Sequence, residues 1–138
     1  MIFDTHAHYD DPTYDPDRAQ LFRELRANGV GLILNPGCDI PSSRRAVALA
    51  EEYDFVYAAV GIHPEECGGT TEADYETLRE LAKHPKVVAI GEIGLDYHWE
   101  DNPGRDEQQP VFRRQLQLAR ELNLPVIVHD RDAHADSL

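Results

Sequence analysis

The feature that most constrains the fold of this chain is a regular alternation of short apolar segments with longer amphipathic ones. The apolar segments are rich in β-branched residues and do not alternate with polar residues, which is typical of strands covered on both faces. Five segments are predicted to be strands: Ile2–Thr5, Gly31–Asn35, Val56–Val60, Val87–Ile90 and Pro125–Val128.

Four amphipathic segments lie between these strands and are predicted to be helices. Gly29 follows the first as a helix-ending residue, Pro41 begins the second, and Pro85 stops the third. This order of strands and helices predicts an α/β fold with a parallel sheet and right-handed crossovers. The predicted helices, with their inward apolar residues, are Asp15–Asn28 (Leu21, Phe22, Leu25), Pro41–Tyr53 (Ala46, Val47, Leu49, Ala50), Thr71–His84 (Tyr75, Leu78, Leu81) and Asp106–Asn123 (Val111, Phe112, Leu116, Ala119, Leu122).

Length and composition fit a globular domain without a membrane span. The chain has 138 residues, of which 41% are apolar, and no apolar run approaches the ~20 residues that a membrane span needs. The segment Met1–His6 has neither a basic start nor an apolar signal region, so we expect a cytoplasmic protein. The two cysteines, Cys38 and Cys67, form no CxxC motif and are expected to be buried or incidental free thiols.

The net charge of −13 limits how this chain can meet nucleic acid. A protein that binds nucleic acid by simple electrostatics is basic, because it has to neutralise phosphates. Contact with a phosphodiester would therefore have to be local, through metal ions and a few arginines. The same charge also fits a need for solubility or a saline cytoplasm.

The first candidate site residues are His6 and His8, just after the first predicted strand. Side chains two residues apart on extended backbone share a face, so the two imidazoles can chelate one divalent ion. Asp4 lies on the same face, where it could orient an imidazole. Taken alone, the pair is a weak signal, and a polar turn after the first strand explains it better.

Three further side chains stand at later strand ends. Glu92 follows the fourth strand in an apolar, glycine-flanked segment, where a carboxylate is costly unless it is paired or metal-bound. His129 closes the fifth strand and His63 closes the third. Each has a plain alternative: Glu92 as a residue leaving the sheet, His129 as a helix cap, and His63 as part of a turn at Pro64.

The joint pattern favours a metal site over these separate explanations. In parallel sheets and barrels, ligands bind at the carboxyl ends of the strands, and four of the five predicted strands end in a metal-competent side chain. Mixed histidine and carboxylate ligands suit Zn, Mn or a similar ion and leave Mg open. With Glu92 bridging, the cluster would hold two ions.

Other polar residues near the strand ends have less certain roles. Arg131, two residues after His129, can meet a substrate phosphate through two hydrogen bonds, or it is a surface arginine at a helix start. Asp96 and Tyr97 can orient ligands or substrate, or belong to loop structure. His84, His98 and His134 are expected to face solvent.

The strand-end motifs resemble the successive blocks of the TatD family, in order and over the whole chain. This family belongs to the metal-dependent amidohydrolase-like superfamily of (β/α)8 TIM barrels. The matching segments are Asp4-Thr5-His6-Ala7-His8, Asn35-Pro36-Gly37, Gly61-Ile62-His63-Pro64, Gly91-Glu92-Ile93-Gly94-Leu95-Asp96-Tyr97 and Pro125-Val126-Ile127-Val128-His129-Asp130-Arg131-Asp132-Ala133.

The resemblance implies a function and a role for each matched residue. TatD proteins are metal-dependent deoxyribonucleases, often Mg-dependent exonucleases that act from the 3′ end, so DNA is the implied substrate. His6 and His8 would hold one of two metal ions, Glu92 would bridge them, and His129 would bind the second. His63 resembles a residue that contacts substrate phosphate. We therefore count Glu92 and His63 as catalytic candidates.

The chain departs from the family pattern in length. That pattern continues for roughly as long again, in keeping with the ~250 residues of a typical barrel, and supplies a further His and a late Asp that serves as general base. Five strands and four helices cannot close an eight-stranded barrel and would leave the first and fifth strands as bare edges. We therefore expect residues 1–138 to be the N-terminal part of one TatD-like domain, with a shorter fold completed by dimerisation as the alternative.

Three functions remain open at this point. The first is hydrolysis of DNA phosphodiesters by the full-length parent. The second is hydrolysis of a small ester, amide or phosphoester at the same metal site, which the acidic composition mildly favours. The third is a catalytically incomplete half-barrel that binds metal weakly or binds only a partner.

Overall fold

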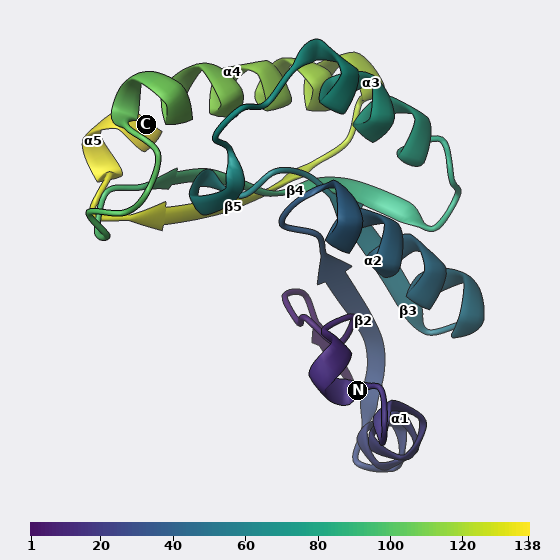
Figure 1. Ribbon diagram of the computed structural model, residues 1–138. Coiled ribbons are helices and arrows are strands. Elements are labelled where there is room, and N and C mark those ends of the chain that lie inside the picture. Colours follow the sequence, from purple (N-terminus) through teal and green to yellow (C-terminus); the bar gives the residue numbers. More distant parts are fainter.

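A single parallel sheet organises the molecule, and the computed structural model describes all residues from Met1 to Leu138. The strands follow one another in chain order across the sheet, as the alternation of elements predicted. The sheet curves as the wall of half a barrel (Figure 1). Its strands are β1 (Ile2–Asp4), β2 (Val30–Pro36), β3 (Val56–Val60), β4 (Val87–Asp96) and β5 (Val126–Arg131).

Two strands run further than the sequence predicted. β4 was expected to end at Ile90 and β5 at Val128, but β4 continues to Asp96 and β5 to Arg131. The two strands stay paired over this extension, with Gly94 opposite His129 and Asp96 opposite Arg131. Glu92 and His129 therefore do not mark the ends of these strands. His129 lies inside β5 opposite Gly94, and Glu92 lies inside β4 where the register between the two strands shifts, with its amide donating to the Gly37 carbonyl at 2.7 Å.

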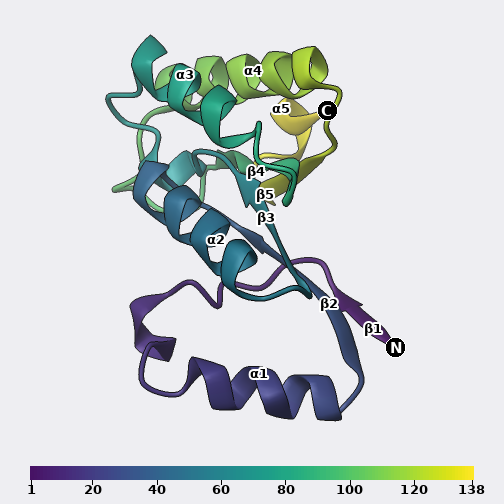
Figure 2. The same ribbon diagram turned by 90° about the vertical axis from the view of Figure 1, so that its right-hand side faces the viewer.

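The helices cover one face of the sheet, the outer face of the half-barrel, as Figures 1 and 2 show. Asp39 caps α2 by accepting a hydrogen bond from the Ser42 amide, so this helix begins one residue before Pro41. None of the helices is long and apolar enough to cross a membrane. The helices are α1 (Arg18–Ala27), α2 (Ile40–Glu52), α3 (Glu72–Leu81), α4 (Arg105–Leu122) and α5 (His134–Ser137), with short 3-10 helices η1 (Pro12–Tyr14) and η2 (Pro64–Glu66).

The core lies between this layer of helices and the sheet. Its most buried members include Ile33, Val56, Leu78, Ile90 and Leu118. One predicted inward residue is wrong, because Leu116 is 37% exposed. The face of α4 that packs on the sheet instead carries Gln115 and Leu118, with Gln115 bonded to the strand end rather than left in solvent.

The other face of the sheet has little cover at its edges. A small cluster of Leu34, Ala59 and Ala89 lies there at the centre of the sheet. Val126 and Val128 in β5 and Ile2 and Phe3 in β1 are exposed, so the prediction that every strand is covered on both faces fails for both edge strands. As expected, β1 and β5 are the two edge strands of an open sheet.

Gly94 allows β4 and β5 to approach closely beside Glu92. Its φ is 145°, a conformation that side chains disfavour, and a Cβ there would collide with the carbonyl oxygen of His129. The atom in the way belongs to the main chain, so no rotamer change can make room. A glycine at this position is thus a condition for bringing His129 next to Glu92.

We predict that Gly94→Ala destabilises the fold by about 3 kcal/mol or more, through a backbone clash added to an unfavourable φ. The matched control is Gly69→Ala, which also has a positive φ of 74° but has open space around it. That control should cost only about 1–2 kcal/mol. Chemical denaturation measures both values, and equal losses for the two variants would contradict the account.

The two free thiols are predicted to react slowly. Burial raises the pKa of Cys67 to about 11, and burial with nearby carboxylates, Glu92 first, raises that of Cys38 to about 12. A raised pKa keeps the thiol protonated, and only the thiolate is alkylated. At about pH 8, Cys67 should be alkylated by iodoacetamide about 100-fold more slowly than in urea-unfolded protein. Equal rates in both states would contradict this.

Candidate metal centre

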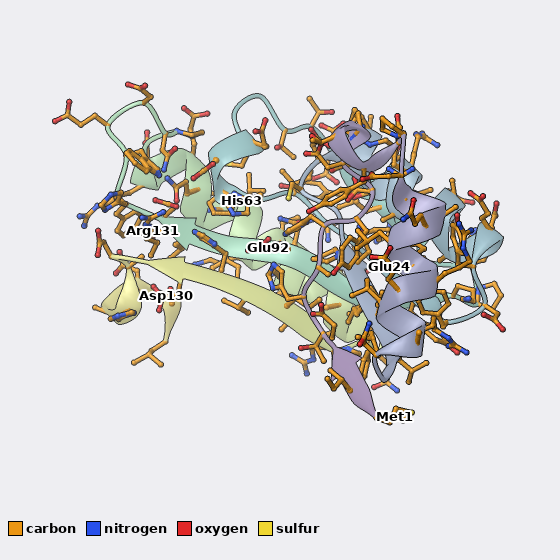
Figure 3. All side chains as sticks on the ribbon, turned by 90° about the horizontal axis from the view of Figure 1, so that it is seen from below. Met1, Glu24, His63, Glu92, Asp130 and Arg131 are labelled. Carbon is orange, nitrogen blue, oxygen red and sulfur yellow. The ribbon has the colours of Figure 1, made fainter.

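Glu92 is the centre of the candidate site. It lies within β4, is only 6% exposed, and has four imidazoles from other segments close to it. Figure 3 shows it beside one of them, His63. Burial by itself raises the pKa of this carboxyl. The hydrogen bond from His8 and the proximity of His63, His6 and His129 outweigh burial and lower the pKa to about 2. Glu92 is therefore a buried carboxylate that stays ionised.

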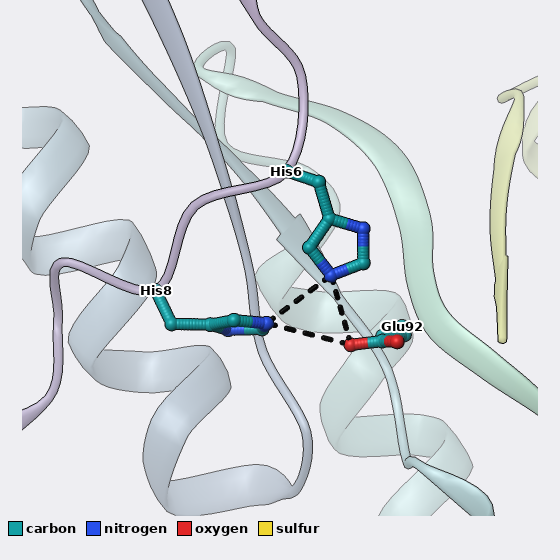
Figure 4. Close-up of side chains that lie close together, drawn as sticks. All are labelled: His6, His8 and Glu92. Atoms are coloured by element: carbon teal, nitrogen blue, oxygen red, sulfur yellow. Dashed lines mark hydrogen bonds and ion pairs between the residues drawn. The ribbon is translucent and has the colours of Figure 1, made fainter.

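One oxygen of Glu92 faces the histidine pair that follows β1. Its Oε2 lies 3.1 Å from His6 Nε2 and 3.5 Å from His8 Nε2. The two Nε2 atoms are 3.2 Å apart, so three atoms that can bind a metal ion lie together (Figure 4). β1 ends at Asp4, so this pair lies on the loop rather than on the strand. Asp4 accepts a hydrogen bond from the His6 amide and orients main chain, not an imidazole.

The other oxygen of Glu92 faces the later strands. Its Oε1 lies 3.1 Å from Nδ1 of His129 and 3.8 Å from Nε2 of His63. The rings of His63 and His129 are themselves in contact, with centroids 4.3 Å apart. The two oxygens of one carboxylate thus address two separate sets of histidines.

Hydrogen bonding decides which nitrogen of His8 is free. Its Nδ1 lies 3.1 Å from the carbonyl oxygen of Pro36. A carbonyl oxygen only accepts, so Nδ1 carries the hydrogen, and the neutral ring turns the lone pair of Nε2 toward Glu92 and His6. The pKa of His8 is raised, first by its hydrogen bond with Glu92, and a bound cation would displace that proton.

In His63 the hydrogen is on the other ring nitrogen from that in His8. Its Nδ1 accepts a hydrogen bond from the Glu65 amide at 3.1 Å. Burial lowers the pKa of His63 to about 4, so the ring is neutral near pH 7 and carries its hydrogen on Nε2. That nitrogen therefore presents a hydrogen-bond donor, an N–H group, to the cluster. A donor suits an anionic oxygen of a substrate better than it suits a cation.

The nitrogen and oxygen atoms of this cluster are suitable ligands for a divalent cation. His6, His8 and Glu92 offer ligand atoms that lie within 4.8 Å of one another, and so do His63, Glu92 and His129. Imidazole nitrogens and carboxylate oxygens are the usual ligands of Zn and Mn, and the carboxylate suits Mg as well. The hydrogen on His63 Nε2 leaves Glu92 and His129 as the more suitable pair in the second set.

Arg131 lies outside this cluster. It ends β5 with an exposed side chain, and its guanidinium lies 5.3 Å from the centre of the Trp99 ring. Tyr97 also points elsewhere, since its hydroxyl donates to Asp136 in α5. Asp96, in contrast, is fully buried with its carboxylate against His129.

The remaining histidines are only partly as predicted. His98 and His134 are exposed, where they contact Asp132 and Asp130 respectively. His84 is partly buried and lies 3.0 Å from a carboxylate oxygen of Glu51, so the prediction that it faces solvent holds only in part. None of the three reaches the candidate centre.

The sequence analysis missed a buried pair that supports the His6–His8 loop. Asp10 and Asn35 are both buried and form two hydrogen bonds. The side-chain Nδ2 of Asn35 donates to the Asp10 carboxylate, and the main-chain N–H of Asp10 donates to Oδ1 of Asn35. Arg45 adds an ion pair at 3.4 Å. The available signal was weak: a carboxylate two residues after His8 and an amide at the end of β2.

Comparison with known proteins decides the family. The model of the family "TatD related DNase" matches residues 3–138. The chain belongs to this family. Among curated relatives, it is 49% identical over 136 residues to "Uncharacterized metal-dependent hydrolase YabD" of Bacillus subtilis, covering 99% of this chain and 53% of that protein. It is 38% identical over 134 residues to "3'-5' ssDNA/RNA exonuclease TatD" of Cronobacter turicensis, covering 97% and 51%.

Solved structures of the family share the fold. The crystal structure of the TatD homolog YJJV from Escherichia coli superimposes with a TM-score of 0.91 at 37% identity, over 99% of this chain and 53% of that one. A TatD-family hydrolase from Entamoeba histolytica gives 0.90 at 23% identity, over 99% and 52%, and shows the fold alone. The half-barrel is thus part of a TIM-barrel fold, as the sequence predicted. The chain spans about half the length of the relatives it matches.

Proposed function

We propose that residues 1–138 form the N-terminal part of one metal-dependent hydrolase domain, and that the whole domain cleaves phosphodiester bonds of DNA. The observation that carries this proposal is the position of Glu92, whose two oxygens face separate histidine sets. A buried carboxylate in this position is stabilised by cations on both sides. The name of the Cronobacter relative, an exonuclease on ssDNA and RNA, supports the choice of substrate.

In this proposal the centre holds two divalent ions. His6 and His8 would hold one ion and His129 the other, with the Glu92 carboxylate facing both positions. Ions bound here would activate water and neutralise charge on the leaving oxygen. Mg, Mn and Zn all suit the mixed ligands. The choice of magnesium, the 3′ direction of attack and the cytoplasmic location stay predictions from the sequence.

The chain's own residues bind and orient the substrate. His63 donates from Nε2 to a non-bridging phosphate oxygen, in keeping with its neutral ring and its acceptor bond at Nδ1. Glu92 stays ionised and holds the surrounding imidazoles in position through its two oxygens. Arg131 receives a flanking phosphate at the rim, where its guanidinium is exposed and can form two parallel hydrogen bonds.

A second candidate function is hydrolysis of a small ester, amide or phosphoester at the same centre. The net charge of −13 supports it, because a long polyanion is repelled by an acidic protein while a small substrate is not. A third possibility is that residues 1–138 bind metal but do not turn over substrate by themselves. The further His and the late Asp that the family resemblance implies have no counterpart here.

One assay separates these functions. Residues 1–138 are compared, with Mg²⁺ or Mn²⁺, with a fusion of the same residues to the C-terminal half of the Bacillus relative YabD. We expect the fusion to shorten 5′-labelled single-stranded DNA and the 138-residue chain to be inactive. A fusion that hydrolyses a chromogenic phosphodiester but leaves DNA intact would overturn the nuclease proposal in favour of the small substrate. Full activity of the short chain would contradict the incomplete-centre account.

The bridging role of Glu92 has its own test. Glu92→Gln keeps the shape but removes the charge, so the fusion should lose activity by at least about 100-fold. In residues 1–138, calorimetry with Mn²⁺ should show fewer bound ions. The matched control, Glu66→Gln, makes the same change at an exposed position and should behave as wild type. Unchanged metal content in Glu92→Gln would count against bridging.

A further inference from the structure

The carboxylate of Asp96 is fully engaged at the carboxyl end of β4, and the function proposed above gives it no role. Asp96 is 0% exposed. Its Oδ2 lies 2.9 Å from Nε2 of His129, on the opposite side of the ring from Glu92. Its Oδ1 accepts from the His98 amide at 3.0 Å and from the Asn102 side chain at 3.1 Å. The carboxylate is thus held in one orientation against one ring nitrogen.

A buried glutamine fixes the main chain of Asp96. Gln108, in the first turn of α4, is 1% exposed. Its Oε1 accepts from the Asp96 amide at 2.9 Å, and its Nε2 donates to the Asp96 carbonyl at 2.8 Å. This side chain therefore pairs with Asp96 as a neighbouring strand would. The position of the carboxylate depends on α4 as well as on the sheet.

These contacts select one tautomer of His129. Asp96 and Glu92 flank the ring as carboxylates that only accept, and the contact with Asp96 is the shorter, 2.9 Å against 3.1 Å, so we assign the hydrogen of a neutral ring to Nε2. The lone pair of Nδ1 then points to the side of Glu92, whose Oε1 is 3.1 Å away. His8 has the other tautomer for a similar reason. Its Nδ1–H donates to the Pro36 carbonyl, which leaves the lone pair of Nε2 free.

We propose that Asp96 is a positioning residue that holds His129 as the Nε2–H tautomer and so directs its Nδ1 lone pair to the second metal position. The metal half of this inference rests on the proposed function, while the tautomer is a property of the chain itself. Carboxylates that fix a histidine ligand in this way tune metal affinity by about 10- to 100-fold.

The surroundings of Asp96 make its amide variant the decisive one. Two donors, from His98 and Asn102, converge on Oδ1. In Asp96→Asn the side-chain oxygen stays with those donors, so the amide nitrogen faces His129 and donates to Nε2. The ring must then carry its hydrogen on Nδ1, where it blocks the metal. Asp96→Ala removes the carboxylate without adding a donor, so it imposes neither tautomer on His129.

The order of the two variants separates positioning from packing. If Asp96 only supports the fold, Asp96→Asn is the milder change, because it keeps the volume and the bonds from His98 and Asn102. If Asp96 sets the tautomer, Asp96→Asn is the more harmful change for metal binding. The control Asp132→Asn removes a charge from the same region at an exposed residue that contacts His98 and not His129.

The experiment uses the ¹⁵N-labelled, metal-free 138-residue chain, in buffer alkaline enough to keep imidazoles neutral. Long-range ¹H–¹⁵N spectra should show His129 as Nε2–H in the wild type and in Asp132→Asn, and as Nδ1–H in Asp96→Asn. Calorimetry with Mn²⁺ should show the second ion bound about 10- to 100-fold more weakly in Asp96→Asn, and by a smaller factor in Asp96→Ala.

The outcomes that overturn the inference are distinct from those that overturn the proposed function. A wild-type His129 with its hydrogen on Nδ1, or an Asp96→Asn variant milder than Asp96→Ala, would refute the positioning role. A wild type that binds no Mn²⁺ would refute the proposed metal centre, and the spectra would still decide the tautomer.

Discussion

The structure of the strand ends depends on one buried carboxylate. Glu92 is nearly inaccessible to solvent and ionised, and a charge in that situation needs compensating partners close at hand. The partners come from three segments far apart in the sequence: the loop after β1, the turn after β3, and β5. The end of β2 orients His8 through the Pro36 carbonyl. Gly94 permits the approach of β5, and the Asp10–Asn35 pair holds the loop that carries His6 and His8.

Each imidazole around Glu92 is given a direction by a partner on its far side. Pro36 leaves Nε2 of His8 free, the Glu65 amide makes His63 a donor, and Asp96 faces the outer nitrogen of His129. Three rings of the same chemistry therefore present two kinds of group, lone pairs and a donor. A centre that binds cations and an anionic substrate together requires this division of roles.

The sequence was sufficient to predict the parallel α/β fold and the meeting of His6, His8, His63, Glu92 and His129, because the alternation of strands and helices is local and the carboxyl ends of parallel strands share one edge of the sheet. It did not predict the length of β4, which depends on pairing with a strand more than thirty residues away. It also placed Leu116 inward, where Gln115 is found instead. Buried glutamines and the Asp10–Asn35 pair resemble surface polar residues in sequence, since their partners are main-chain groups or side chains distant along the chain.

The most direct test of the central claim is a crystal structure of this chain grown with Mn²⁺ and measured near the manganese absorption edge. The account predicts two anomalous peaks about 3.5–4 Å apart on either side of the Glu92 carboxylate. One peak should touch Nε2 of His6 and His8, and the other Nδ1 of His129. A single peak, or two peaks that do not share Glu92, would contradict the account.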